Sequence, residues 1–132
     1  MSSNVDTSSF IETLIKEICT MKHGFTCYYD RAPANALFPY SVVSGITASD
    51  LATGDLSMFD IDIWTDDKLP TATEELESLC DELRNFLHNK TISREGSFAG
   101  HIGYETRDPS DDREKDISHR RLVFAARLFY YN

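Results

Sequence analysis

Cysteine is scarce in this sequence, and long hydrophobic runs are absent from it. The three cysteines, Cys19, Cys27 and Cys80, contain no C-x-x-C pair, and their odd number leaves at least one thiol without a disulfide partner. We therefore expect reduced thiols in a reducing compartment. No apolar run approaches the roughly 20 residues that span a bilayer, and the N-terminus has neither the basic start nor the apolar core of a signal peptide. These absences predict a soluble, unexported protein with no membrane contact.

Basic residues are also few. The chain has 13 Lys and Arg against 22 Asp and Glu, which gives a net charge of −9. A protein that wraps nucleic acid needs clustered Lys and Arg to displace counterions, so this balance argues against such binding. An acidic surface repels a phosphate backbone, and this suits a conduit through which DNA passes without specific contacts.

Motifs for catalysis are missing as well. There is no G-x-S-x-G nucleophile elbow and no G-x-x-x-x-G-K-[ST] phosphate loop. Histidines 88, 101 and 119 are scattered among polar neighbours, and we expect each of them at the surface. The sequence therefore predicts no catalytic residues and no cofactor.

Two groups of residues raise the question of a metal ion. Cys19-x3-His23-x3-Cys27 offers three zinc ligands, but Gly24 is expected to end a helix between them, and a structural zinc site needs a fourth ligand. Asp60 and Asp62 lie two apart on a predicted strand and face the same way, as a pair of Mg²⁺ ligands would. The alternative for these acids is the solvent face of an amphipathic strand, which we favour; no metal ligands are predicted.

Hydrophobic periodicity predicts an α+β fold with a mainly antiparallel sheet of about five strands and two helices packed on one face. In the stretch 58–67, Phe59, Ile61 and Ile63 alternate with the two acids, as in a strand with one packed and one wet face. A capping box, Thr71-x-x-Glu74, is expected at the start of the second helix. The expected helices cover 9–23 and 69–90, and the expected strands 24–30, 40–47, 58–67, 96–107 and 117–131. We expect one domain over residues 1–132.

Aromatic residues near both ends of these strands have two interpretations. They pack in the core and its rim, or they form a protein–protein surface, where Tyr and Trp are enriched. The charged stretch 108–116 is likewise either a solvated tip or an arm that orders against a neighbour. The aromatic residues concerned are Tyr28, Tyr29, Trp64, Phe129, Tyr130 and Tyr131.

The order of these signals resembles a known family. A short helix and a proline-broken loop precede "FPYSVVSG" (38–45). The strand "LSMFDIDIWTDD" (56–67), the amphipathic helix "TATEELESLCDELRNFL" (71–87) and two further strands follow. From about residue 9 to residue 131, this order is similar to that of the tail-completion or tail-terminator proteins of long-tailed bacteriophages.

The resemblance implies a virion structural protein without catalytic residues, located in the tail or neck and present in the host cytoplasm during assembly. Such proteins close the tail tube as a ring, usually a hexamer, and contact both the tail tube protein and the head connector. DNA passes through the ring. Asp60 and Asp62 are then candidates for an acidic lumen. Candidates for contacts with neighbouring subunits are Tyr28, Tyr29, Trp64, Tyr104, Arg107, Arg113 and Tyr131.

Three alternatives stay open at this point. A head–tail connector (head-completion) protein of the neck has much the same sequence signals. A small metal-dependent enzyme would use Asp60 and Asp62. A monomeric adaptor or inhibitor would use its acidity to engage a basic partner.

Overall fold

The computed structural model describes residues 7–51, 54–66, 71–96, 98–108 and 117–130. No helix among these residues is long and apolar enough to cross a membrane. In chain order the elements are α1 (Thr7–Met21), β1 (Thr26–Tyr29), β2 (Tyr40–Leu51), β3 (Gly54–Asp66), α2 (Ala72–Leu87), β4 (Thr91–Arg94), β5 (Phe98–Asp108) and β6 (Ile117–Tyr130).

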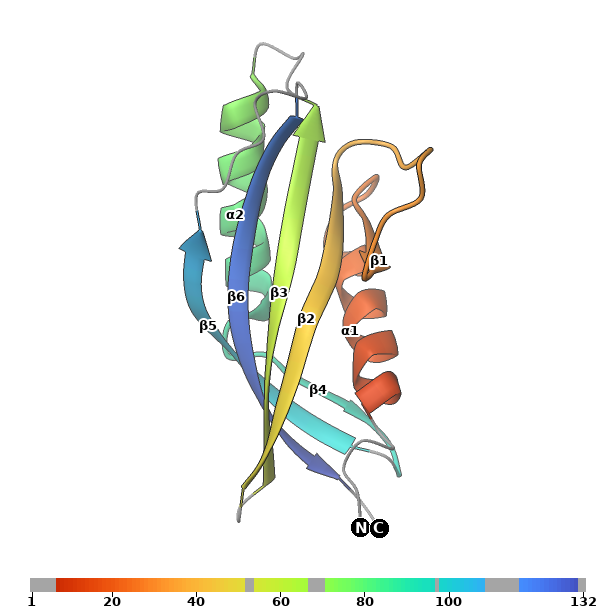
Figure 1. The fold of residues 1–132 in the computed structure, drawn as a ribbon, viewed down its shortest axis with the longest axis vertical. Helices are drawn as coiled ribbons and strands as arrows, with labels where there is room; N and C mark the ends of the chain where they lie inside the picture. Colours follow the sequence, from red (N-terminus) through yellow and green to blue (C-terminus); the bar gives the residue numbers. More distant parts are fainter. Residues whose placement is uncertain (1–6, 52–53, 67–70, 97, 109–116, 131–132) are drawn as a thin grey trace.

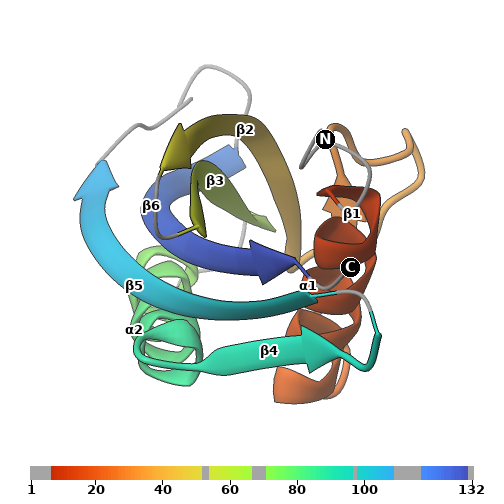
Figure 2. The same cartoon turned by 90° about the horizontal axis from the view of Figure 1, so that it is seen from below.

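The strands form one sheet in the order β1-β2-β3-β6-β5-β4. β1 runs parallel to β2, and each other neighbouring pair is antiparallel. Figure 1 shows the long central strands, and Figure 2 shows how the sheet curls into a half-barrel. The predicted α+β class is confirmed, with six strands in place of about five. The missed strand, β4, has four residues and only one buried side chain, Ile92, which is too little for a recognisable alternation.

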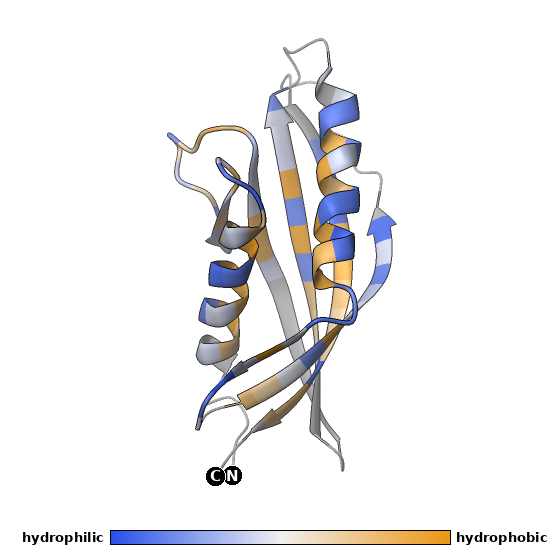
Figure 3. Ribbon diagram, turned by 180° about the vertical axis from the view of Figure 1, so that it is seen from behind, coloured by the Kyte–Doolittle hydropathy of each residue, from blue (hydrophilic) through white to orange (hydrophobic). Residues whose placement is uncertain are grey.

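Both helices pack on one face of the sheet, and Figure 3 shows them from that side with their apolar stripes turned toward the strands. Phe59, Ile61 and Ile63 of β3 are fully buried beneath them, as the alternation in 58–67 predicts. Burying each such side chain contributes about 1.5–3 kcal/mol. We call the opposite side of the sheet, which carries Asp60 and Asp62, the helix-free face.

α1 lies across the gap between the two edge strands, β1 and β4, and contacts both of them (Figure 2). Arg94 of β4 donates one hydrogen bond to Ser9 Oγ, at 3.1 Å, and another to Glu12 Oε1, at 3.0 Å. The curled sheet is therefore bridged by a helix where its two edges come nearest, which covers backbone groups that an edge strand leaves unpaired.

The helix ends agree only in part with the expected signals. Gly24 has φ +82°, a conformation that glycine adopts without strain, and the chain leaves α1 just before it. Thr71 precedes α2 but makes no side-chain capping bond, so the predicted capping box is wrong in this respect. The strands expected over 40–47 and 58–67 are longer than predicted, because β2 continues to Leu51 and β3 begins at Gly54.

The three thiols differ in environment, and this leads to a prediction. Burial raises the pKa of both Cys27 and Cys80 to about 12, whereas Cys19 is exposed on α1. Because the thiolate is the reactive form, a maleimide at pH 8 should label Cys19 alone in the folded protein. Mass spectrometry of the labelled chain checks this. In urea all three thiols should react, and rapid labelling of Cys27 or Cys80 without urea would contradict the buried placement.

Candidate interaction surface on the helix-free face

A row of aromatic rings crosses the helix-free face. Tyr40 opens β2 and pairs in register with Trp64 of β3, which pairs with His119 of β6. Residues paired in this way on one face lie about 5 Å apart, so their rings meet. The Tyr40 and Trp64 rings stack with centroids 6.4 Å apart, and those of Trp64 and His119 stack at 4.1 Å. Phe38 extends the row at 5.4 Å from Tyr40, and Tyr28 meets Tyr40 edge-on at 5.9 Å.

Beside this row lies a cluster of charges centred on Asp62. Arg121, its register partner on β6, donates to both carboxylate oxygens, from Nε at 2.8 Å and from Nη2 at 3.3 Å. Nε2 of His119 lies 3.1 Å from Oδ1 of the same carboxylate. Asp62 is only 7% exposed, so the expectation that both acids face solvent is wrong for this residue.

The two acids of this cluster have opposite electrostatics. Burial raises the pKa of Asp62, but its contacts with His119 and Arg121 lower it more, and the resulting pKa lies below the ordinary value. Burial raises the pKa of Asp60, and the charge of Asp62 adds to the effect, while Arg121 opposes it. Asp62 is therefore the stronger acid, whose ionised form Arg121 stabilises, and Asp60 is the weaker acid.

This geometry also bears on the two metal hypotheses. Nε of Arg121 lies 2.8 Å from Asp62 and 3.9 Å from Asp60, so a guanidinium occupies the place that a shared cation would need. Cys27 is buried, while Cys19 and His23 are exposed. Within the described ranges, no three His, Cys, Asp or Glu side chains are grouped closely enough to hold a metal ion.

A small pocket of about 210 Å³ opens next to the aromatic row. Its walls combine the row with the first residues of the β1–β2 connection, which lie against the sheet here. The lining residues are Asp30, Arg31, Ala32, Tyr40, Val42, Asp62 and Trp64. The helix-free face is therefore partly covered by this connection, which explains why Val42 and Asp62 are buried without a helix above them.

The predicted contact residues are distributed over three places. Tyr28 and Trp64 both lie in the aromatic row, where each of their rings contacts Tyr40. Tyr29 is 48% exposed and lies instead beside α1. Tyr104 and Arg107 lie at the contact of β5 with α2, where the Tyr104 ring packs on Phe124. Arg113 and Tyr131 lie outside the described residues.

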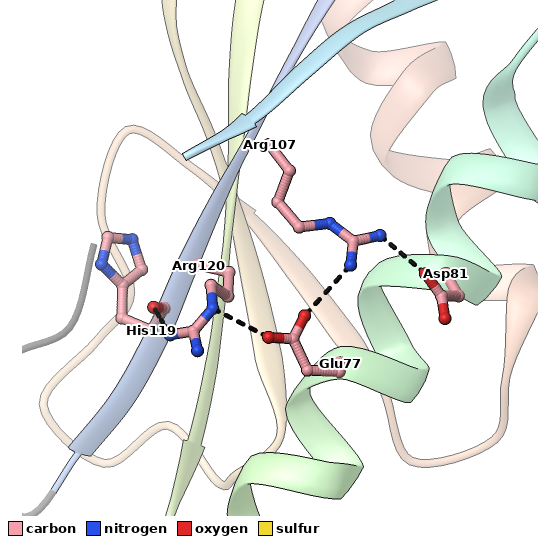
Figure 4. A network of polar contacts seen from close by, with 5 residues as sticks. All are labelled: Glu77, Asp81, Arg107, His119 and Arg120. Atoms are coloured by element: carbon pink, nitrogen blue, oxygen red, sulfur yellow. Dashed lines mark hydrogen bonds and ion pairs between the residues drawn. The ribbon is translucent and has the colours of Figure 1, made fainter. Parts of the chain in front are cut away.

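Arg107 belongs to a network that ties α2 to the sheet (Figure 4). It donates to Glu77 at 3.0 Å and to Asp81 at 2.8 Å, and Glu77 also accepts from Nε of Arg120 at 3.2 Å. Arg120 is only 9% exposed and donates a further bond to the carbonyl of His119, at 2.9 Å. Glu77 thus neutralises two arginines from different strands.

Sequence reasoning missed the roles of Phe38, Tyr40 and His119. His119 was expected at the surface, yet it is 7% exposed under Trp64. The signal that could have found them is the register of β2, β3 and β6, since Tyr40, Trp64 and His119 become neighbours only once these strands are aligned.

Comparisons with known proteins show the fold. No protein-family model and no curated protein sequence matches this chain. A chain from the virion of a native gene transfer agent particle aligns with a TM-score of 0.59 and 18% identity, covering 92% of this chain and 98% of that one. A second solved structure aligns with a TM-score of 0.64 and 12% identity, covering 100% of this chain and 99% of that one.

The Asp62 cluster predicts how stability depends on pH. Because the pKa of Asp62 is lower in the folded chain than in the unfolded one, its contribution is complete above about pH 5 and is lost as the pH falls through the folded value. Asp62→Asn should lower the free energy of unfolding by about 1–3 kcal/mol at pH 7, and the deficit should shrink below about pH 4. Urea titrations over this pH range measure both effects.

Asp60→Asn is the matched control. The raised pKa of Asp60 means that its ionised form is disfavoured in the fold, so this change should be neutral or slightly stabilising at pH 7. An equal fall in the free energy of unfolding in the two variants would contradict the lowered pKa of Asp62. A fall in Asp62→Asn that is the same at every pH would contradict it as well.

The Glu77 network gives a second stability prediction. Glu77→Gln leaves Arg107 and the nearly buried Arg120 without their shared carboxylate, so the free energy of unfolding should fall by about 2 kcal/mol. Glu82→Gln on the same helix removes one exposed pair with Lys22, at 3.3 Å, and should cost less than about 1 kcal/mol. Urea denaturation compares the two, and similar losses would show that Glu77 has no special role.

Proposed function

We propose that this chain is a structural protein of a phage-like virion, a ring-forming tail terminator that caps the tail tube and joins it to the head connector. The observation that carries the proposal is the likeness of fold to a chain from the virion of a gene transfer agent particle, which extends over 92% of this chain and 98% of that one. Nearly complete coverage of both chains supports extending the proposed role to the whole chain.

The side-chain geometry supports a non-enzymatic role. Among the described residues, ion pairs on both faces, those of Glu77 with Arg107 and Arg120 and that of Asp62 with Arg121, hold strands and helices together. The Asp60 and Asp62 pair, which a metal-dependent enzyme would use, is bridged by Arg121 instead. The enzyme alternative is therefore disfavoured by the structure of its own candidate site.

The negative charge supports the passage of DNA. A net charge of −9 per subunit disfavours attachment to a phosphate backbone, and a ring multiplies this effect around its lumen. The partners in this proposal are further copies of the chain, the tail tube protein and the proteins of the neck. A head–tail connector one layer nearer the head is the second candidate, since the same virion fold likeness supports it equally.

The test is made on particles from the cell that encodes the chain. Mass spectrometry of purified particles should detect the chain at a few copies per particle. Deleting its gene should yield heads and tails that do not join, seen by electron microscopy. Tails of unregulated length indicate a terminator, whereas finished tails beside leaking heads indicate a connector.

Two outcomes would overturn the proposal. One is that the chain is missing from purified particles. The other is that the deletion strain produces joined particles in normal number. A plasmid copy of the wild-type gene is the control, because it should restore joined particles and so exclude effects of the deletion on neighbouring genes.

A further inference from the structure

An apolar hollow lies on the outer side of α1. It has a volume of about 410 Å³ and is formed by one flank of the helix together with the exposed ring of Tyr29 from the edge strand β1. The lining residues are Ile11, Glu12, Ile15, Lys16 and Tyr29. Ile15 packs in part against the core, but both isoleucines of this flank are only partly buried, and exposed apolar patches mark binding surfaces.

The same chain carries an exposed apolar projection, of which Phe38 stacks on Tyr40 with ring centroids 5.4 Å apart. Leu37 is 81% exposed and Phe38 is 38% exposed, both in the connection between β1 and β2. The stretch from Ala32 to Tyr40 contains no charged residue, which is unusual in a protein of which 27% is charged. We call Leu37 and Phe38 the loop tip.

Charges around these two surfaces are complementary. The hollow is rimmed by the acidic Glu12, which also pairs with Arg94 of its own chain at 3.0 Å, and by the basic Lys16, one turn along α1. The loop that carries the tip begins with the acidic Asp30 and the basic Arg31, both exposed. If the loop of one copy approaches the hollow of another in the right orientation, Asp30 faces Lys16 and Arg31 faces Glu12. Most other encounters between two copies are repulsive, because each copy has a net charge of −9.

We propose that the loop tip of one copy inserts Leu37 into the α1 hollow of a second copy, with Asp30 and Arg31 meeting Lys16 and Glu12 at the rim. The hollow is large enough for Leu37 and part of the Phe38 ring. Because the tip and the hollow are different patches, the contact is heterologous and continues from copy to copy until a ring closes. This inference rests on the proposed ring and specifies the contact that builds it.

The experiment uses one variant on each side of the contact. Leu37→Asp puts a charge on the tip, and Ile11→Glu puts a charge in the hollow while keeping a good helix former. Sedimentation velocity of each, up to about 1 mM, should show self-association weakened tenfold or more, since every 1.4 kcal/mol is tenfold in affinity. Leu37→Met keeps the apolar tip and should associate as the wild type does.

Mixing the two variants is the decisive step. The intact tip of Ile11→Glu fits the intact hollow of Leu37→Asp, so the mixture should form a dimer of one copy of each and nothing larger. Met58→Asp is the matched charge control, because Met58 is a 40% exposed apolar residue on the helix-free face and should be without effect. Urea denaturation midpoints of all variants identify any variant that is unfolded. If Ile11→Glu is unfolded, Tyr29→Ser takes its place, and if Leu37→Asp is unfolded, Leu37→Ser does.

Each result decides the matter. A wild-type chain that stays monomeric to about 1 mM overturns the contact, because a dissociation constant weaker than this would not sustain a ring. Unchanged association of Leu37→Asp, or failure of the mixture to form the dimer, also overturns it. The proposed function fails separately: a chain that is missing from particles but behaves as above refutes the virion role and keeps the contact.

Discussion

The pairing of β3 with β6 determines most of what is found on both faces of this protein. The two strands stay in unbroken register from Asp55 opposite Leu128 to Asp66 opposite Ile117. On the helix side this register stacks Phe59 on Phe124, with centroids 5.6 Å apart, in the centre of the core. On the helix-free face it sets Trp64 beside His119 and Asp62 beside Arg121. A slip of one residue would turn each of these side chains to the wrong face.

The same register places charged residues of β6 in partly buried positions, and acidic partners compensate them on both faces of the sheet. His119, Arg120 and Arg121 are consecutive in β6, so they alternate between the two faces of the sheet. Arg120 points to the helices and meets Glu77, while Arg121 points away and meets Asp62. In each pair one partner is nearly buried, Arg120 in the first and Asp62 in the second, so removing the other partner leaves a poorly solvated charge with less compensation. Glu77 and Asp62 therefore compensate the charges of Arg120 and Arg121, one on each face of β6.

The sequence predicts the elements of the fold well because their periods are long enough to read. Leu76, Leu79 and Leu83 mark α2, and the alternation of Phe59, Ile61 and Ile63 marks β3, and all of them are buried as predicted. The short strand β4 was not predicted, because four residues carry too little pattern. The exact ends of the helices were not predicted either. Sequence patterns also failed to predict the burial of a side chain where a residue distant in sequence covers it.

Asp62 and His119 show this failure most clearly. Alternation places Asp62 on the face away from the core, and it does lie there, but alternation cannot reveal that Arg121 and the β1–β2 connection cover it. A polar neighbourhood in sequence suggested an exposed His119, whereas the ring is buried because β6 lies next to Trp64. The candidate surface is thus assembled from residues up to 91 positions apart, from Tyr28 to His119, and becomes visible only after the strand register is known.

The same cluster limits how an acidic ring could repel DNA. Asp62 is nearly buried and paired with Arg121, whose Nε also lies 3.9 Å from Asp60, so this guanidinium offsets part of the negative charge that the two acids would present to a lumen. The repulsion between copies and from DNA must then come mainly from acids elsewhere on the chain. Copies of such a chain meet most readily where charge is absent, and among the residues whose exposure is described the uncharged loop around Leu37 is the longest exposed stretch of this kind. Electrostatics thus favours the loop tip over the helix-free face for the proposed contact between copies.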